Sequence, residues 1–255
     1  MTVPIELPPL TLTGERTLPG IDVENYWYRR HEAVYLAVAG FCRGAVVVDA
    51  GCGEGYGAAL LHRLGAGRVI GTDLAPEAVA HAAARYPFVD FVRADSAQLP
   101  LAGAAAEVVV SSQVIEHLDD QPGFVAECAR VLRPAGTLVL STPNRFTFSP
   151  GLARAVNPFH TRELSADELV ALVADDFEVA RLLGVSHGSR LRRWERRHGS
   201  LVAAQLAVPP ESWPPSLRST VSSVTADDFR LSPHGVDSAL DLVIVGIRRT
   251  ACRAS

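Results

Sequence analysis

The clearest chemical pattern in the sequence is an acidic residue followed by closely spaced glycines, in the stretch VVVDAGCGEGYG over residues 46–57. Asp49 ends an apolar run, and Gly51, Gly53 and Gly55 lead into a stretch with helical periodicity. Glycine lets the backbone approach a ligand because it has no Cβ, and the N-terminus of a following helix offers N–H groups and positive potential. The pattern therefore predicts a loop that holds a small ligand.

Two cofactor classes compete for this loop. A dinucleotide fingerprint reads G-x-G-x-x-G and places a pyrophosphate on the helix N-terminus, but its third glycine would fall at Tyr56 here. Asp49 would also repel a pyrophosphate, whereas a carboxylate suits a ligand that carries an ammonium group. S-adenosylmethionine carries such a group, so the spacing favours it over NAD.

Two further acids stand where the next strands along the chain are expected to end. Asp73 closes the run RVIGTD, and Asp95 closes the run FVRAD. A carboxylate at the first position can accept hydrogen bonds from ribose hydroxyls, as in dinucleotide-binding folds. One at the second position can accept from an adenine amino group. Three acids at the ends of successive strands favour a nucleoside cofactor over solvated loop residues.

The elements that must position these acids alternate along the chain. We expect strands at 45–50, 68–73, 88–94, 106–112, 136–142, 177–183 and 240–247, and helices at 25–42, 57–64, 76–85, 123–132 and 166–174. Such alternation predicts an α/β, Rossmann-like fold, with a mostly parallel seven-stranded sheet, helices on both faces and ligands at the carboxyl ends of the strands. We expect a single domain over 1–255, with an N-terminal arm and helix at 1–42 and an insertion or lid at about 185–236.

Composition narrows the class of partner. The net charge of −4 argues against nucleic acid, since phosphate neutralisation needs a basic surface. The apolar runs are too short for a membrane span. The four cysteines form no C-x-x-C pair, which favours a reducing, cytoplasmic compartment. The sequence leaves open whether the protein forms a homodimer.

Over residues 25–145 the sequence resembles the class I methyltransferases, within the broad group of ubiquinone- and menaquinone-pathway enzymes. The resemblance implies that the loop of Asp49, Gly51, Gly53 and Gly55 holds the methionine end of S-adenosylmethionine. It further implies ribose binding by Asp73, with Leu74 against adenine, and contacts to the adenine edge by Asp95 and Ser96. Gln113 is expected near the sulfonium.

A second resemblance runs over most of the chain, on the segments LTGERT (12–17), ENYWYRRH (24–31), STPNR (141–145) and NPFHTREL (157–164). These look like segments of actinobacterial sugar O-methyltransferases that are associated with polymethylated polysaccharides such as methylglucose lipopolysaccharide. The resemblance implies O-methylation of a sugar or oligosaccharide hydroxyl in polysaccharide biosynthesis.

Methyl transfer to a hydroxyl needs the oxygen aligned behind the methyl group and a group that accepts its proton. His117, in QVIEHL after the fourth strand, is a candidate base because histidine titrates near neutral pH. His160, after the fifth strand, is the second candidate. Each could instead cap or orient its own loop.

A metal role is the alternative for Glu116 and His117. Some ubiquinone-type O-methyltransferases show E-x-x-E-H at this place and bind Mg²⁺, but here Gln113 replaces the first Glu. Mg²⁺ prefers oxygen ligands, so the departure weakens the case for this ion and leaves the metal unknown.

Residues outside these motifs have open roles. Arg30 can hold a cofactor carboxylate through two parallel hydrogen bonds, or can be a surface arginine. In the insertion, Trp194 and its neighbouring arginines can face a sugar, or can form a solvated helix face. The other functions considered are methylation of a quinone or lipid-like acceptor, which the arginines disfavour, and a non-catalytic module that only binds the cofactor.

Overall fold

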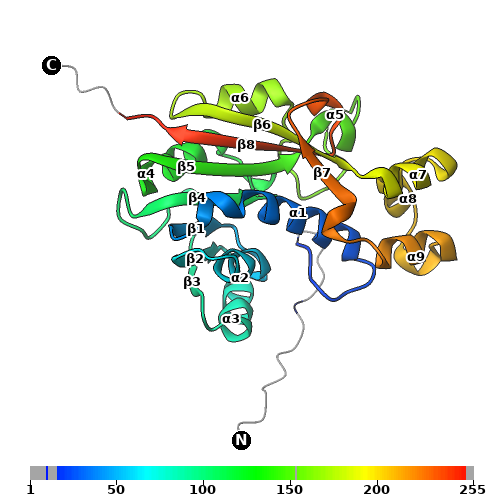
Figure 1. The fold of residues 1–255 in the computed structure, drawn as a ribbon, viewed down its shortest axis with the longest axis horizontal. Coiled ribbons are helices and arrows are strands. Elements are labelled where there is room, and N and C mark those ends of the chain that lie inside the picture. Colours follow the sequence, from blue (N-terminus) through cyan, green and yellow to red (C-terminus); the bar gives the residue numbers. More distant parts are fainter. Residues whose placement is uncertain (1–9, 11–15, 153, 251–255) are drawn as a thin grey trace, which may run out of the picture.

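The architecture is that of a computed structural model, which describes residues 10, 16–152 and 154–250. One sheet has the strand order β3-β2-β1-β4-β5-β8-β6-β7 (Figure 1). Its strands are β1 Val46–Ala50, β2 Arg68–Asp73, β3 Asp90–Arg93, β4 Ala106–Ser112, β5 Leu132–Pro143, β6 Phe177–His187, β7 Phe229–Ser232 and β8 Asp241–Arg248. Strands β1 to β5 pair in parallel, whereas β8 is antiparallel to β5 and to β6, and β7 is antiparallel to β6.

Helices connect and cover these strands. They are α1 Asn25–Cys42, α2 Tyr56–Arg63, α3 Pro76–Arg85, α4 Gln121–Val131, α5 Arg145–Phe148, α6 Ala166–Val173, α7 Ser189–His198, α8 Leu201–Leu206 and α9 Pro215–Ser222. Short 3₁₀ turns are η1 Ile115–His117, η2 Pro210–Ser212, η3 Ala226–Asp228 and η4 Val236–Ser238. Local chemistry sets several starts: Pro76 begins α3, Asp120 caps α4, and Ser165 forms a capping box at α6.

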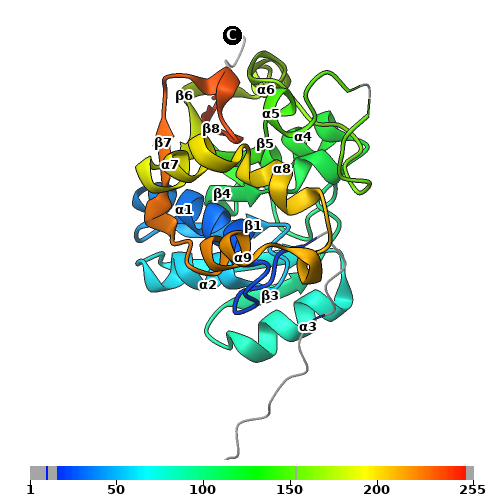
Figure 2. The same ribbon diagram turned by 90° about the vertical axis from the view of Figure 1, so that its right-hand side faces the viewer.

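Both faces of the sheet are buried, which explains why its strands read as continuous apolar runs. On one face Val47, Val69 and Val110 pack with α1, α2 and the insertion helices. On the other face Val48 and Val109 pack with α4 and α6. Figures 1 and 2 show the sheet between these two helical layers.

The predicted Rossmann-like fold is confirmed, with one strand more than expected. The residues expected for α1, β2, α3 and β4 coincide with those observed. The eighth strand, β7, lies at the end of the insertion and pairs along β6, which continues to His187. The rest of the insertion forms α7, α8 and α9, and Figure 2 shows these helices and β7 around α1.

The chain changes direction in the sheet between β1 and β4. After β1 the sheet grows outward through β2 and β3, and β4 then returns to the opposite side of β1. Ligand-binding crevices form at such switch points, outside the carboxyl ends of the strands. The loops after β1, β2, β3 and β4 therefore meet at one edge of the sheet.

Most of the predicted N-terminal arm, residues 1–9 and 11–15, lies outside the described residues. Within the described part of the chain, no helix is both long enough and apolar enough to cross a bilayer.

Asn144 anchors the end of β5 to the segment before β8. Its Nδ2 donates to the carbonyls of Val236, Asp237 and Ala239 at 3.0–3.1 Å, and its Oδ1 accepts from the N–H of Phe146. The side chain is fully buried, so these carbonyls have no ready replacement for the amide.

We expect Asn144→Ala to lower the free energy of unfolding by about 2–4 kcal/mol, because several buried acceptors lose their donor. Urea denaturation measures this. Asp237→Ala is the matched control, since it keeps the backbone carbonyl and removes only an exposed side chain. A loss equal to that of the control would contradict the anchoring role.

Candidate active site

Two adjoining cavities lie at the carboxyl ends of the parallel strands. The first has a volume of about 240 Å³ and the second about 350 Å³. Arg16, Thr17, His31, Gln113 and His117 line both. Because the two cavities share this lining, a ligand in the first cavity and a ligand in the second can meet beside Gln113 and His117.

The predicted site residues divide between these cavities. The first cavity is lined by Gly51, Gly53, Asp73, Leu74, Ser96 and Gln113. The second is lined by Arg30, Glu116 and His160, and His117 lines both. Asp49, Gly55 and Asp95 are not among the residues that line either cavity.

The glycine loop has the backbone that its sequence predicts. Gly51 has φ +79°, and a Cβ there would lie 2.3 Å from the side chain of Val114. Gly55 has φ +89°, and a Cβ there would lie 2.8 Å from the side chains of Ala82 and Phe91. Both the left-handed conformation and the close packing require glycine, so the loop can lie flat against the first cavity.

Asp49 lies beneath this loop and is fully buried. The Tyr35 hydroxyl donates to its Oδ1 at 3.0 Å, and Oδ2 has no hydrogen-bond partner. Burial raises the pKa of Asp49 to about 7, although the hydrogen bonds from Tyr35 and the backbone of Ala58 oppose the shift. The side chain of Asp49 is therefore held from α1 by Tyr35, and one of its oxygens stays open at the start of the glycine loop.

Asp73 stands at the wall of the first cavity and holds the loop with the same carboxylate. Its Oδ2 accepts from the N–H of Gly53 at 2.8 Å, and its Oδ1 accepts from the N–H of Ala75 at 2.9 Å. Each carboxylate oxygen has two acceptor sites, so both oxygens can still receive a ligand hydroxyl. Leu74, 61% exposed, presents an apolar surface beside it.

The third predicted acid is placed differently from its neighbour Ser96. Asp95 is exposed, and its Oδ1 accepts from the N–H of Ala97 at 2.9 Å. Ser96 is buried and lines the first cavity. Ser96 is thus the one of the two that lines the space where a ligand fits.

Gln113 occupies the turn after β4 with φ +58°, which is unusual for a residue with a side chain. Its N–H donates to the carbonyl of Ser141, and its Nε2 donates to the Ser141 hydroxyl at 3.2 Å and to Asp241 at 3.4 Å. These bonds hold the turn between the two cavities.

Arg30 is committed to a protein partner. Its guanidinium forms a two-point ion pair with Asp241, and its Nη2 also donates to the carbonyl of Leu240. The side chain is buried and lines the second cavity, where Nη1 has no hydrogen-bond partner. The structure thus brings Arg30 to the second cavity rather than to the glycine loop.

The second cavity combines aromatic walls with polar groups. Trp27, Phe148 and Phe159 supply rings, and Arg30 and Asn157 supply nitrogen atoms. From the insertion, Leu206 reaches it. Trp194 instead stacks on His198, with ring centroids 4.5 Å apart.

The arginines of α7 do not line this cavity either. Arg190 pairs with Asp228, and it also donates to the carbonyl of Ser223. This part of the insertion therefore presents its charge to the protein and to solvent.

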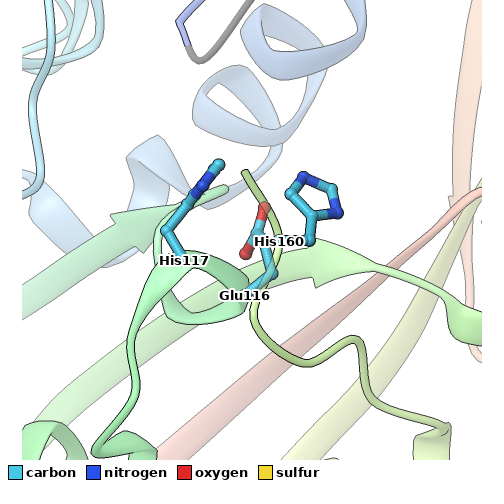
Figure 3. A group of neighbouring side chains, drawn as sticks. All are labelled: Glu116, His117 and His160. Carbon is cyan, nitrogen blue, oxygen red and sulfur yellow. The ribbon is translucent and has the colours of Figure 1, made fainter. Parts of the chain in front are cut away.

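Glu116, His117 and His160 form a compact cluster at the junction (Figure 3). One nitrogen or oxygen atom from each lies within 4.8 Å of those of the others. Figure 3 shows the Glu116 carboxylate between the two imidazoles, with all three side chains on the same side of their backbones. Glu116 and His117 come from η1, and His160 from the loop between α5 and α6.

The Glu116 carboxylate is buried and only half satisfied. Its Oε2 accepts from the Thr142 hydroxyl at 3.0 Å, and its Oε1 has no hydrogen-bond partner. Burial raises the pKa of Glu116 to about 8, against the hydrogen bonds from its own backbone and Thr142. A cation or a hydrogen-bond donor at Oε1 would offset the free-energy cost of burying this oxygen without a partner.

Each imidazole is oriented through its Nδ1. In His117 the Nδ1 lies 3.0 Å from the carbonyl oxygen of Phe159, and in His160 it lies 2.8 Å from Oε1 of Glu163. Both partners are acceptors, so each Nδ1 carries the proton and the Nε2 of the neutral ring carries a lone pair. The two rings are 4.9 Å apart and nearly perpendicular.

Sequence reasoning missed the partners that hold these groups. Tyr35 under Asp49, Asp241 beside Arg30 and Glu163 beside His160 are contacts that no local motif announces. His31 was passed over as well, although it lines both cavities. Burial lowers its pKa to about 4, so this imidazole is neutral at the junction.

Comparison with known proteins agrees with this geometry. The family model described as a methyltransferase domain matches residues 48–140, which begin within β1 and contain the glycine loop and β2 to β4. A Mycobacterium tuberculosis protein described as a probable S-adenosylmethionine-dependent methyltransferase is 51% identical over 247 residues, covering 94% of this chain and 90% of that protein. A ubiquinone biosynthesis O-methyltransferase of Mesorhizobium japonicum is 35% identical over 114 residues, covering 43% of this chain and 45% of that protein.

Among solved structures, a Haloferax volcanii methyltransferase in complex with the Trm112 activator has a TM-score of 0.62 at 20% identity. The similarity covers 87% of this chain and 91% of that chain, and it concerns the fold. The first cavity, with the glycine loop and Asp73 at its wall, lies at the carboxyl ends of the parallel strands, where open α/β sheets bind ligands. The chain therefore belongs to the S-adenosylmethionine-dependent methyltransferases, and S-adenosylmethionine is its cofactor.

Proposed function

We propose that the protein is an O-methyltransferase that acts on a sugar or oligosaccharide hydroxyl. One observation supports this most: the cluster of Glu116, His117 and His160 stands where the cofactor cavity meets a second cavity large enough for an acceptor. A hydroxyl must lose its proton during transfer, and this cluster offers basic groups at that place.

The cofactor would lie in the first cavity with its sulfonium methyl towards Gln113. Gly51 and Gly53 would face its methionine end, supported by Asp49 beneath. Asp73 would accept the ribose hydroxyls, and Leu74 and Ser96 would border adenine. A contact of Asp95 with the adenine edge rests on the resemblance alone, because Asp95 is exposed and does not line the cavity. Arg30, expected at the cofactor carboxylate, fits better as a residue of the acceptor site, because its side chain lines the second cavity and not the first.

The lining of the second cavity suits a sugar. Trp27 and Phe148 offer rings for the apolar face of a pyranose, while Arg30 and Asn157 offer hydrogen-bond donors for hydroxyls. Together with the resemblance to sugar O-methyltransferases, this supports an acceptor from a polymethylated polysaccharide such as methylglucose lipopolysaccharide. The buried free cysteines Cys42, Cys52 and Cys128 fit a reducing, cytoplasmic compartment.

A second acceptor class has one observation in its favour. Large exposed apolar side chains occur in the segments that border the second cavity, namely Phe146, Leu152, Val156, Phe159 and Leu206. These would suit a quinone or lipid-like acceptor, and the Mesorhizobium japonicum relative is named for such a substrate. A non-catalytic cofactor-binding module is disfavoured, since it needs no basic cluster between two cavities.

An acceptor screen with methyl-labelled S-adenosylmethionine tests the proposal. Oligosaccharides, quinols and fatty acyl compounds are offered in parallel, and the position of the new methyl group is read by NMR. Methylation of a sugar oxygen is expected. Methylation of quinols alone would assign the second acceptor class instead.

We expect Asp73→Ala to weaken binding of S-adenosylhomocysteine by about 1.5–3 kcal/mol, roughly 10- to 150-fold, because hydrogen bonds to a charged group are lost. Calorimetry measures the affinity, and circular dichroism checks the fold. Asp73→Asn keeps an acceptor for the loop N–H groups, so its affinity for S-adenosylhomocysteine should fall less. Asp90→Ala, at an exposed carboxylate on β3, is the control. Unchanged affinity in a folded Asp73→Ala protein would refute the ribose role.

We expect His117→Ala to reduce turnover by roughly 10²–10⁴-fold, the usual contribution of proton transfer at a positioned group. Binding of S-adenosylhomocysteine should stay near normal, since the glycine loop and Asp73 are untouched. His198→Ala removes an exposed histidine of α7 and should leave turnover unchanged. If His117→Ala keeps near-normal turnover while His160→Ala is inactive, the general base is His160 instead.

We expect Asp49 to lower the stability of the cofactor-free protein as the pH rises from about 4 to about 7, while buried Glu116 acts in the same direction and buried His31 in the opposite one. Asp49 has a pKa of about 7 when folded, above its ordinary value of 3.8, so the folded state binds the extra proton in this window. The wild type should therefore lose stability relative to Asp49→Asn across this window. Denaturation at several pH values measures it, with exposed Asp95→Asn as control. A curve for Asp49→Asn parallel to that of the wild type would contradict this account.

A further inference from the structure

Three candidate ligands from two segments of the chain converge at the junction of the cavities. The nearest nitrogen and oxygen atoms of Glu116, His117 and His160 lie within 4.8 Å of one another. Ligands about 2.0–2.2 Å from a shared ion in tetrahedral geometry stand roughly 3.3–3.6 Å apart. Closing the widest of these separations by about 1.2–1.5 Å would therefore bring all three atoms onto one ion.

The buried carboxylate gives an independent sign of a missing partner. Glu116 is 1% exposed, and its Oε1 has no hydrogen-bond partner. Buried carboxylate oxygens are normally paired or bound to a cation. Since Oε2 is already held by Thr142, the open oxygen is the one available to an ion.

The imidazoles show the outer contacts that metal-binding histidines have. A ligating histidine donates its second N–H to a carboxylate or to a backbone carbonyl, which fixes ring and tautomer. His160 has the first type of partner, in Glu163, and His117 has the second, in the carbonyl of Phe159. In His160 the Asn157 amide now lies 3.1 Å from Nε2, the position that an ion would take.

On these grounds we propose that Glu116, His117 and His160 bind a divalent transition-metal ion such as Zn²⁺ or Co²⁺ in preference to Mg²⁺. Two imidazole nitrogens and one carboxylate suit first-row transition ions, which bind such sets with open positions, whereas Mg²⁺ prefers oxygen. Gln113 does not join the set, because its amide is turned to Ser141 and Asp241.

The site deepens the proposed function, on which its role rests. All three ligands line the second cavity, so the open coordination positions face the acceptor. An ion held by Glu116, His117 and His160 would lower the pKa of an acceptor hydroxyl bound to it. The imidazoles would then act as ligands, and the hydroxyl proton would pass to water instead of to His117. The hydroxyl oxygen would bond to the methyl carbon while the carbon–sulfur bond breaks, which gives the methyl ether, S-adenosylhomocysteine and the released proton.

The test titrates Co²⁺ into the full chain, after EDTA treatment, desalting and removal of any histidine tag, and follows visible absorption. One Co²⁺ per chain is expected to bind. Zn²⁺ should displace it, whereas Mg²⁺ at the same concentration should not. Glu163→Gln should weaken binding by roughly 10- to 100-fold, the cost of an outer partner. The loss of Co²⁺ affinity should be larger in each of the three ligand variants, Glu116→Gln, His117→Ala and His160→Ala. His234→Ala, an exposed histidine, should bind Co²⁺ as the wild type does.

Calorimetry with S-adenosylhomocysteine shows that each variant is folded, and Glu116→Gln keeps the size of the side chain. Co²⁺ binding that none of the three substitutions weakens, or equal displacement by Mg²⁺, would overturn the site. The titration uses no acceptor, so failure of sugar methylation leaves its result intact. Full sugar methylation by protein that binds no metal would overturn the site and leave the proposed function standing.

Discussion

The buried ion pair between Arg30 and Asp241 joins the elements on which both cavities depend. Arg30 comes from α1 and Asp241 from the start of β8, and the two side chains are 2% and 0% exposed. The guanidinium also lies over the Trp27 ring, and Gln113 reaches the same carboxylate. Removing one member would leave an uncompensated buried charge, so the first helix and the turn between the cavities are fixed together.

A second buried chain of contacts extends this arrangement into the insertion. The hydroxyl of Tyr26 lies 2.7 Å from Nε2 of His187, whose Nδ1 lies 2.9 Å from Glu195 on α7. Residues of α1, β6 and α7 thus share one polar network inside an apolar cluster. The helix that lines the second cavity is therefore held by the sheet on one side and by the insertion on the other.

The sequence predicted what depends on local patterns. The glycine loop, Asp73 and the strand–helix alternation rest on spacings of a few residues, and these are present as expected. Contacts between distant residues were beyond such reasoning, because Arg30 and Asp241 are separated by 211 positions. The direction of a side chain was equally hidden, so the sequence left two roles open for Arg30 and two for Trp194. Strand β7 was missed because four residues are too few to establish an alternating pattern.

The two outermost strands of the sheet, β3 and β7, are also its shortest, with four residues each. An open strand edge invites pairing with another chain, and short edges with charged side chains suppress it. Here β3 presents Asp90 and Arg93, and β7 presents Arg230, all exposed. The apolar interior strands are thus shielded at both margins, which protects the protein against association by sheet extension and directs any self-association to its helical faces.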